Sequence, residues 1–493
     1  MDIRQHIPFI LIFIPLITGI IIPLLKKIKT PKIMTFISLG IIMFLSLILM
    51  DFLLKSKVYF LYNLGHYSAP WGNQLRIGIL EGLLSLTFIL TMILSILGGF
   101  KNILKDIKVE KQKYYFIMLN LLIASLLALV YTNDIFTAYV FIEINTVAAC
   151  SIVLAKESGE TIRATIKYFI MSALGSGLFL MGLAILYSLT GHLLMGNLYT
   201  SIQELALTGE YNIPLTVSFV LIIVSLGIKS ALFPFYGWLP DAHSSATATS
   251  SAILSGLVLK GYIVLLLKII YRVYGINIAK QLNILNILFI LGFLSMIIGS
   301  IFALTQKDLK RIIAYSSVAQ IGYIYISIGL GNSLGLIAAI YHIIVHALTK
   351  SMLFLASGKF IEITNNKDIE KLKGIGYIDP ISGVAFLVGS LSMVGIPLFA
   401  GFISKILIGN ASIQNNNFML ITMAGLAFSA LLNGLYYIPI IFKIFNKKEK
   451  NIYEEYILGK DGLGNLALIL LIVGNIFLGI FPLPIIKLIE IGI

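Results

Sequence analysis

Long runs of apolar residues alternate with short polar loops along almost the whole chain. Fourteen of these runs reach about 17–25 residues, the length that a helix needs to cross roughly 30 Å of hydrocarbon. They lie near residues 8–25, 33–54, 78–100, 114–131, 134–154, 166–189, 214–236, 247–271, 282–303, 312–330, 334–358, 381–410, 417–442 and 463–486. The pattern predicts an all-α polytopic membrane protein with about 14 transmembrane helices.

Composition supports this interpretation. The 493 residues are 58% hydrophobic and only 12% charged, whereas soluble domains carry about 25% charged residues. The first run, residues 8–25, has the length of a signal peptide, but no small-residue cleavage site follows it and further runs come after. We therefore expect a retained first helix. The single Cys150 excludes a disulfide framework within the chain and a cluster held by cysteines.

The formal net charge of +14 is distributed unevenly between the two sets of loops. Loops that follow odd-numbered helices hold 23 Lys and Arg residues, and the opposite side holds 7. Cytoplasmic loops of membrane proteins carry such an excess of Lys and Arg. The bias predicts that the 23 lie in the cytoplasm and that both termini lie on the outer side. It also accounts for the basic charge without a nucleic-acid partner.

Two runs are interrupted by Pro and Gly in mid-membrane. The seventh reads SLGIKSALFPFYGWLPDAH, with Pro234 just after Lys229, and the twelfth reads SLSMVGIPLFAGFISK, with Pro397 just before Lys405. Pro removes a backbone donor, and freed backbone groups at membrane depth are tolerated where they line a cavity or other protein. Broken helices in corresponding places of two halves are typical of repeated transporter folds. Pro kinks without a transport role are the alternative.

Several ionisable residues fall within or at the edge of the apolar runs. A charge at the bilayer centre costs about 2.5–3.5 kcal/mol on insertion scales, so a chain that keeps a series of them is expected to use them for charge movement. Lys268 is expected to snorkel to the interface. For Lys167, both snorkelling and a buried role are open. Lys350 has the alternative of reaching the cytoplasmic interface. The residues in question are Glu143, Lys167, Lys229, Lys260, Lys268, Lys350 and Lys405.

Six strings along the chain resemble one family, in the order that family has them. They are FIEINTVAA, GIKSALFPFYGWLPDAH, SSAILSGLVLKGYIVLL, KDLKRIIAYSSVAQIGYI, AAIYHIIVHALTKSMLFLASG and GIPLFAGFISK. Similar strings occur in the antiporter-like membrane subunits of respiratory complex I, Mrp-type cation/proton antiporters and membrane-bound hydrogenases. The resemblance covers nearly the whole chain. It implies fourteen helices with two inverted five-helix repeats and broken helices 7 and 12. It further implies that the polypeptide divides into residues 1–110 with helices 1–3, residues 111–275 with the first repeat, residues 276–445 with the second repeat, and residues 446–493 with helix 14.

The resemblance also implies site residues. Glu143 on the fifth helix, Lys229 on the seventh, Lys260 on the eighth and Lys405 on the twelfth match family positions, as do His342, His346 and Lys350 on the eleventh. We expect a lateral proton relay through Lys229, Lys260, His346, His342 and Lys350 to Lys405, with water bridging the gaps. A static Glu143–Lys229 ion pair is the alternative. The two histidines stand four residues apart, a spacing that also suits a metal, but we expect no metal.

Three residues are candidates for proton uptake or gating. His243 follows the break in the seventh helix, with a helix cap or surface contact as the alternative. Asp134 is expected to cap the fifth helix at its start, with a proton-input role as the alternative. Lys310 matches a basic family residue in the loop before the tenth helix.

These features together predict an ion-translocating subunit of a multi-subunit complex in a prokaryotic cell membrane, moving H⁺ with Na⁺ coupling left open. The chain stops soon after the fourteenth run, and Lys405 stands where one complex I member usually carries Glu. That favours proteins resembling the Mrp D subunit or its hydrogenase counterpart, with a complex I member as the alternative. A non-transporting structural subunit and a self-sufficient antiporter are the competing hypotheses. No haem, flavin, quinone or iron–sulfur ligand set is readable, so no cofactor is expected, and any redox chemistry would belong to partner subunits.

Overall fold

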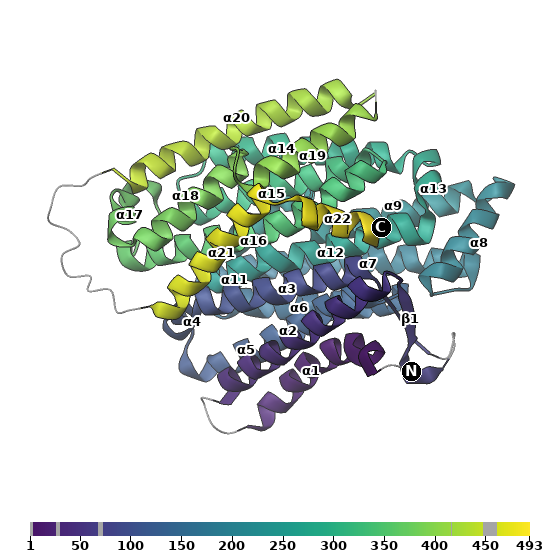
Figure 1. Ribbon diagram of the computed structural model, residues 1–493, viewed down its shortest axis with the longest axis horizontal. Coiled ribbons are helices and arrows are strands. Elements are labelled where there is room, and N and C mark those ends of the chain that lie inside the picture. The colour runs from purple at the N-terminus through teal and green to yellow at the C-terminus, as the bar shows by residue number, and fades with distance from the viewer. Residues whose placement is uncertain (1–2, 26–29, 68–71, 416, 447–460) are drawn as a thin grey trace.

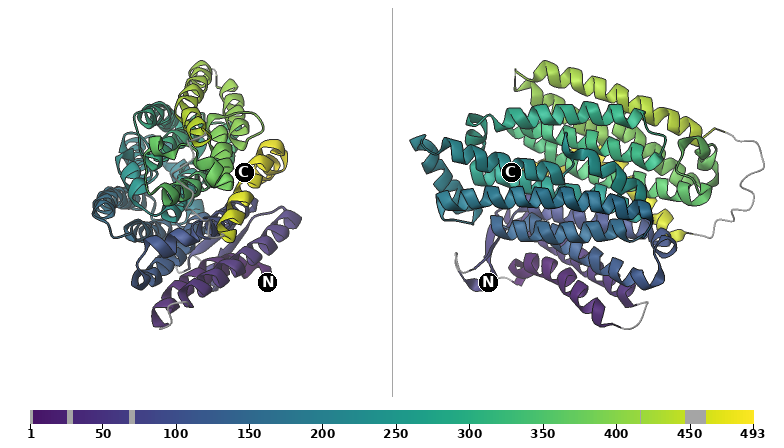
Figure 2. Two further views of the ribbon diagram at one scale, coloured as in Figure 1. Left: turned by 90° about the vertical axis from the view of Figure 1, so that its left-hand side faces the viewer. Right: turned by 180° about the vertical axis from the view of Figure 1, so that it is seen from behind.

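The computed structural model describes residues 3–25, 30–67, 72–415, 417–446 and 461–493. Within these residues the long helices run side by side in one bundle, and short helices gather at its two ends (Figure 1). Figure 2 shows that the same alignment holds from the side and from behind. Seven lysines that contribute to the predicted orientation lie outside the described residues: Lys26, Lys27, Lys29, Lys447, Lys448, Lys450 and Lys460.

Thirteen helical segments in the described part are long and apolar enough to cross a membrane. Twelve of them are built on α1 (Ile7–Ile21), α2 (Thr30–Ser56), α3 (Ile79–Gly98), α5 (Val109–Tyr131), α6 (Ile135–Leu154), α7 (Gly159–Thr190), α9 (Asn212–Lys229), α14 (Ile284–Leu304), α15 (Leu309–Gly329), α16 (Ser333–Thr364), α20 (Met419–Ile444) and α21 (Gly462–Ile480). The thirteenth joins α11 (Ala248–Ile253), η5 (Leu254–Val258), α12 (Leu259–Ile269) and η6 (Ile270–Tyr274).

Both predicted breaks are present. After Lys229, the last residue of α9, the chain turns through η4 (Phe235–Trp238) into α10 (Leu239–Ser245). The twelfth run divides into α18 (Pro380–Val394) and α19 (Ala400–Ile413), with Gly395 between them at a φ of 94°. These two short helices complete the fourteen predicted spans and confirm the all-α polytopic membrane fold.

Several short elements were not predicted. An antiparallel pair, β1 (Phe60–Asn63) and β2 (Gln74–Ile77), joins α2 to α3, with Phe60 opposite Ile77. The others are η1 (Ile3–His6), η2 (Ile22–Leu24), η3 (Leu64–His66), α4 (Phe100–Asp106), α8 (Met195–Thr208), α13 (Ile276–Gln281), η7 (Ile369–Leu372), α17 (Ile375–Ile378) and α22 (Leu483–Gly492). All of these elements are shorter than an apolar run that crosses a membrane, so the apolar pattern did not predict them. The described residues after 446 form two helices, α21 and α22, where the sequence predicted one.

The eleventh apolar run, predicted to end near residue 358, continues further as a helix than expected. Helix α16 continues to Thr364, and Lys359 is buried with its Nζ 3.3 Å from an Asp461 carboxylate oxygen. The sequence pattern ended the helix at the first charge. That charge is tolerated inside because a carboxylate from the start of α21 meets it.

Two segments form the centre of the bundle. The most apolar stretches of α16 and of residues 248–274 are completely buried inside the protein, and that of α15 is almost completely buried. Helices α7, α14, α20 and α21 lie outside them and expose apolar side chains. The central segments carry Lys260, His342, His346 and Lys350, so these ionisable residues lie along the axis of the protein and away from its lipid-facing surface.

Candidate functional site

One end of the buried polar chain lies at the first broken helix. The Nζ of Lys229 donates to Thr146 Oγ1 at 3.0 Å and lies 3.9 Å from Glu143 Oε1. Glu143 and Thr146 stand one turn apart on α6, so both face the end of α9. The Lys229 side chain is fully buried, whereas the Glu143 side chain is 39% exposed at the edge of the bundle. The structure therefore places the predicted pair together, with Glu143 Oε1 buried beside the ammonium and the Glu143 side chain as a whole partly exposed.

Polar groups that the sequence did not single out continue this chain inward. The hydroxyl of Tyr262 lies 3.4 Å from Thr146 Oγ1 and donates to Asn145 Oδ1 at 3.1 Å. The Asn145 side chain in turn donates to Ser125 Oγ at 3.0 Å. Tyr262 stands two residues after Lys260 on α12. These hydroxyl and amide side chains are uncharged at neutral pH, so the charges inside the apolar runs did not point to them.

Lys260 lies in the centre of the bundle, fully buried. Its ammonium donates to the carbonyl of Ser255, which belongs to the π-helical segment η5 just before it. Wide helical turns of this kind occur often at functional sites. The Ser255 hydroxyl lies 2.9 Å from that of Ser317 on α15, so this position connects the first half of the protein to the second.

Two histidines on α16, His342 and His346, continue the buried polar chain. Their rings lie 5.9 Å apart, and His342 Nδ1 lies 2.9 Å from Ser404 Oγ. Both ring nitrogens of His346, Nε2 of His342 and both amide atoms of Gln320 are buried without a hydrogen-bond partner among the described residues. Buried polar atoms are nearly always bonded to protein or to ordered water. This cluster of unsatisfied groups is therefore suited to holding water.

The buried polar chain has its other end at the second broken helix. The ammonium of Lys405 donates to the carbonyls of Met393 at 2.9 Å and Val394 at 2.5 Å, which are the last two residues of α18. These carbonyls are at the negative end of the helix dipole, where the helix itself supplies no donors. Lys405 also lies 5.3 Å from the ring centroid of Tyr323. The break thus creates the acceptors that hold a lysine inside the membrane.

Lys350 occupies a side branch. It is fully buried, and its Nζ donates to Ser316 Oγ at 2.7 Å and to the Ile313 carbonyl at 3.0 Å. The alternative in which it reaches the cytoplasmic interface is therefore wrong. His342 contacts Ser404, the sequence neighbour of Lys405. Lys350 lies 3.5 Å from the hydroxyl of Tyr437, and its place in the order of the relay stays a prediction.

The three uptake or gating candidates occupy different environments. His243 is fully buried, stacks on Phe354 with centroids 4.5 Å apart, and has two ring nitrogens without a partner in the described part of the chain. The alternative prediction that His243 makes a surface contact is therefore wrong, because the side chain is fully buried. The ammonium of Lys310 donates to the Ala246 carbonyl at 2.8 Å, where α10 ends. Asp134 caps α6 as predicted, accepting from the Thr137 amide at 2.6 Å.

The two remaining lysines differ sharply. Lys167 is half exposed and pairs with Asp241 at 2.8 Å, a contact at the end of the bundle. Lys268 does not snorkel, and that prediction is wrong: it is buried and donates to the carbonyls of Leu129 at 3.1 Å and Val130 at 3.0 Å. These carbonyls belong to the last turn of α5, where a helix leaves its acceptors free.

A polytopic membrane protein with two broken helices, joined by a buried row of lysines and histidines, defines a class of ion-handling membrane subunits. Comparison with known proteins makes this specific. Residues 132–431 match the family described as NADH:quinone oxidoreductase/Mrp antiporter, TM. The chain belongs to this family, as the sequence motifs indicated.

Two relatives and one solved structure illustrate the match. The N subunit of the NADH-quinone oxidoreductase of Desulforudis audaxviator is 32% identical over 390 residues, covering 78% of this chain and 75% of that protein. The D subunit of the Na(+)/H(+) antiporter of Alkalihalophilus pseudofirmus is 29% identical over 362 residues, covering 73% and 71%. A chain of the membrane-bound sulfane sulfur reductase, an archaeal respiratory membrane complex, has a TM-score of 0.87 at 27% identity, covering 99% of this chain and 96% of that one.

Proposed function

We propose that this protein is an ion-translocating subunit of a multi-subunit membrane complex and that it moves protons along its buried polar axis. The observation that carries the proposal is the position of Lys229 and Lys405. Each lies at the break of an interrupted helix, and Lys260, His346 and His342 lie in the buried centre between them. A static scaffold gains nothing from this arrangement, because each buried charge costs free energy that an apolar residue would not.

The proposed transfer begins at the Glu143–Lys229 pair. At 3.9 Å the two charges are close enough to attract each other but do not share a direct hydrogen bond. Approach of the carboxylate stabilises the ammonium, and separation favours loss of its proton toward Lys260. Moving one charge against 100 mV requires about 2.3 kcal/mol, which is a change that a single buried ion pair can supply. Because the Glu143 side chain is partly exposed at the edge of the bundle, a neighbouring subunit could alter the position of this pair.

From Lys260 the proposed path runs through His346 and His342 to Lys405. Ser404 and Tyr323 lie beside the last step, and water completes the gaps between groups that are not in direct contact. Lys350 and Ser316 form a side branch of the buried polar chain. His243 and Lys310 lie on the side of this polar chain where α10 ends. These positions suit proton uptake.

Similarity to the Na(+)/H(+) antiporter relative and to a respiratory complex chain supports a role within an assembly. We assign the protein to an Mrp-type antiporter as its D subunit, or to the corresponding hydrogenase-type complex, in a prokaryotic cell membrane. The sequence similarity to the NADH-quinone oxidoreductase relative makes a complex I-type assembly the second candidate. The distribution of Lys and Arg supports an orientation with both termini on the outer side, and Na⁺ is the candidate coupled ion.

The test is ion transport by the assembled complex in membrane vesicles, comparing Lys229→Ala and Glu143→Ala with the unchanged protein. We expect each variant to lose most of the proton flux while the complex still assembles. Lys55→Ala is the matched control, because Lys55 is exposed and pairs with Asp51 near the end of α2. Unchanged flux with normal assembly would show a structural subunit instead. Robust Na⁺-dependent proton flux by the isolated chain would show that no partner is needed.

A further inference from the structure

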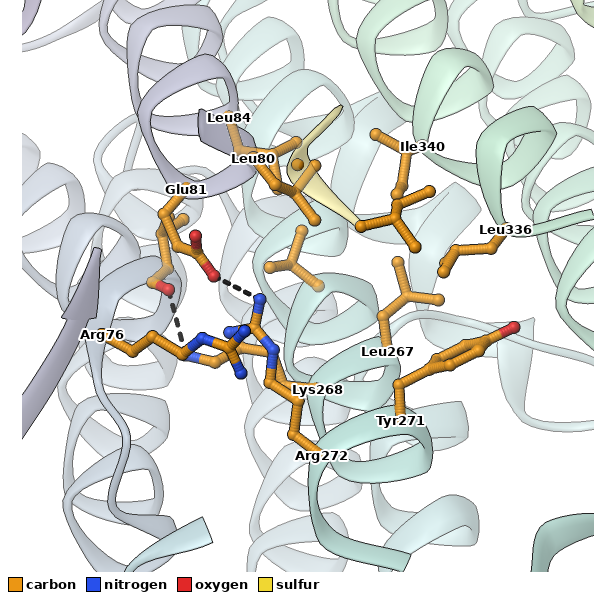
Figure 3. Close-up of a pocket in the computed structure, with 14 residues that line it drawn as sticks. Arg76, Leu80, Glu81, Leu84, Leu267, Lys268, Tyr271, Arg272, Leu336 and Ile340 are labelled. Carbon is orange, nitrogen blue, oxygen red and sulfur yellow. Dashed lines mark hydrogen bonds and ion pairs between the residues drawn. The ribbon is translucent and has the colours of Figure 1, made fainter. Parts of the chain in front are cut away.

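A cavity of about 260 Å³ lies away from the polar axis just described. It forms where β2 and the start of α3 meet the end of α12, the first turns of α16 and the end of α22. Figure 3 shows that charged side chains gather on one side, from Arg76, Glu81, Lys268 and Arg272. Apolar side chains form the opposite wall, among them Leu80, Leu84, Leu336 and Ile340.

The cavity holds more positive than negative charge. Its lining includes three cationic side chains, Arg76, Lys268 and Arg272, and one acidic side chain, Glu81, beside Ile493, the last residue of the given sequence. The Glu81 carboxylate is already engaged: Oε1 lies 2.5 Å from Arg272 Nη2, and Oε2 accepts from the Gly78 amide at 2.9 Å. The cationic side chains outnumber the acidic groups of this partly desolvated site, which leaves an excess of positive charge. The cavity therefore favours an additional anion.

Two guanidinium nitrogens of the cavity, Arg76 Nε and Arg272 Nη1, are buried without a hydrogen-bond partner among the described residues. Arg76 stacks on the Tyr59 ring at 4.3 Å, which fixes its guanidinium without using its N–H groups. Burial and the neighbouring charge of Arg272 lower the pKa of Arg76. A bound anion would offset both effects, and guanidinium groups match the oxygen geometry of phosphate particularly well.

We propose that this cavity binds the phosphate group of a membrane amphiphile. The phosphate would accept from Arg76 and Arg272, and the adjoining apolar carbons would lie against Leu80, Leu336 and Ile340. The volume suits a headgroup and its first carbons, so the remaining chains would stay in the bilayer. Inorganic phosphate offers the same oxygens without the apolar part. This inference does not depend on the transport proposal.

The experiment measures binding to the purified full-length chain in delipidated detergent micelles. Phosphatidylglycerol, zwitterionic phosphatidylcholine and inorganic phosphate are titrated separately, and thermal stability is followed. We expect saturable stabilisation by phosphatidylglycerol and at least a tenfold weaker apparent affinity in Arg76→Gln. Arg76→Lys keeps the charge and should restore part of the affinity. Lys280→Gln is the control, because Lys280 is exposed and does not line the cavity.

The outcomes separate the two sources of phosphate. Stabilisation by phosphatidylglycerol that inorganic phosphate does not reproduce supports a lipid. Equal stabilisation by inorganic phosphate, also lost in Arg76→Gln, supports a phosphate site but excludes the apolar contribution. Binding that is the same in Arg76→Gln and in the unchanged protein, or no saturable binding of either ligand, would overturn the proposal. A melting temperature for Arg76→Gln equal to that of Lys280→Gln without ligand shows that the variant is folded.

Discussion

Gly395 leaves the space that the side chain of Lys405 fills. A Cβ added at Gly395 would stand 2.8 Å from Lys405 Cδ and 2.9 Å from its Nζ. The same glycine ends α18 with a φ of 94°, and the last two carbonyls of that helix accept from the lysine. One residue thus provides both the break and the room for the charge.

Gly395→Ala should displace Lys405 from the carbonyls of Met393 and Val394. We expect proton flux in vesicles to fall at least about tenfold, while a left-handed backbone angle costs a side chain about 1–2 kcal/mol of stability. Gly177→Ala is the matched control, since Gly177 lies in α7 with no described neighbouring atom within 4 Å of an added Cβ. Normal flux in Gly395→Ala would mean that the position of Lys405 is not critical.

His243→Phe separates a gating role from a packing role. Phenylalanine keeps the stacking on Phe354 but removes both ring nitrogens, which have no partner within the described residues. If His243 passes protons, flux should fall at least about tenfold with no loss of melting temperature, since a positioned acid or base contributes about 10²–10⁴-fold. His192→Phe, at an exposed histidine after α7, should leave flux unchanged. Retained flux in His243→Phe would assign the residue to packing alone.

Gly322→Ala should destabilise the contact between α14 and α15. An added Cβ would come within 2.5 Å of the Gly292 carbonyl oxygen and of the Met296 amide, and neither backbone can move aside without separating the helices. We expect a loss of about 1–3 kcal/mol, the usual cost of overpacking, seen as a lower melting temperature in detergent. Gly40→Ala, at an open position on α2, is the comparison and should change little. Equal melting temperatures would contradict the close approach.

Asp134→Asn tests the cap of α6 and its dependence on pH. Burial raises the pKa of the Asp134 carboxyl, so the folded protein disfavours its charged form and stability falls as pH rises through that pKa. Asparagine caps helices about as well without the charge. The variant should therefore be at least as stable as the unchanged protein at pH 7, and the difference should shrink in acid. Asp134→Ala should lose about 1 kcal/mol. A less stable Asn variant at pH 7 would contradict this account.

The sequence by itself determined the number of membrane spans, the two breaks and the set of ionisable residues inside the bilayer. These features are local: apolar length reports a crossing helix, and Pro or Gly beside a lysine reports a break. The family motifs named Glu143, Lys229 and Lys405, and the structure places each beside a break or its partner.

Only the tertiary structure decided which groups hold each charge. Lys268 donates to carbonyls of α5, Lys405 donates to carbonyls of α18, and His342 contacts Ser404 beside Lys405. The contact of Glu143 with Lys229 and the cavity at Arg76 likewise depend on segments far apart in the chain. Hydropathy shows that a residue lies in the membrane, but its partner is set by how neighbouring helices rotate and pack, and that information is not contained in either helix alone.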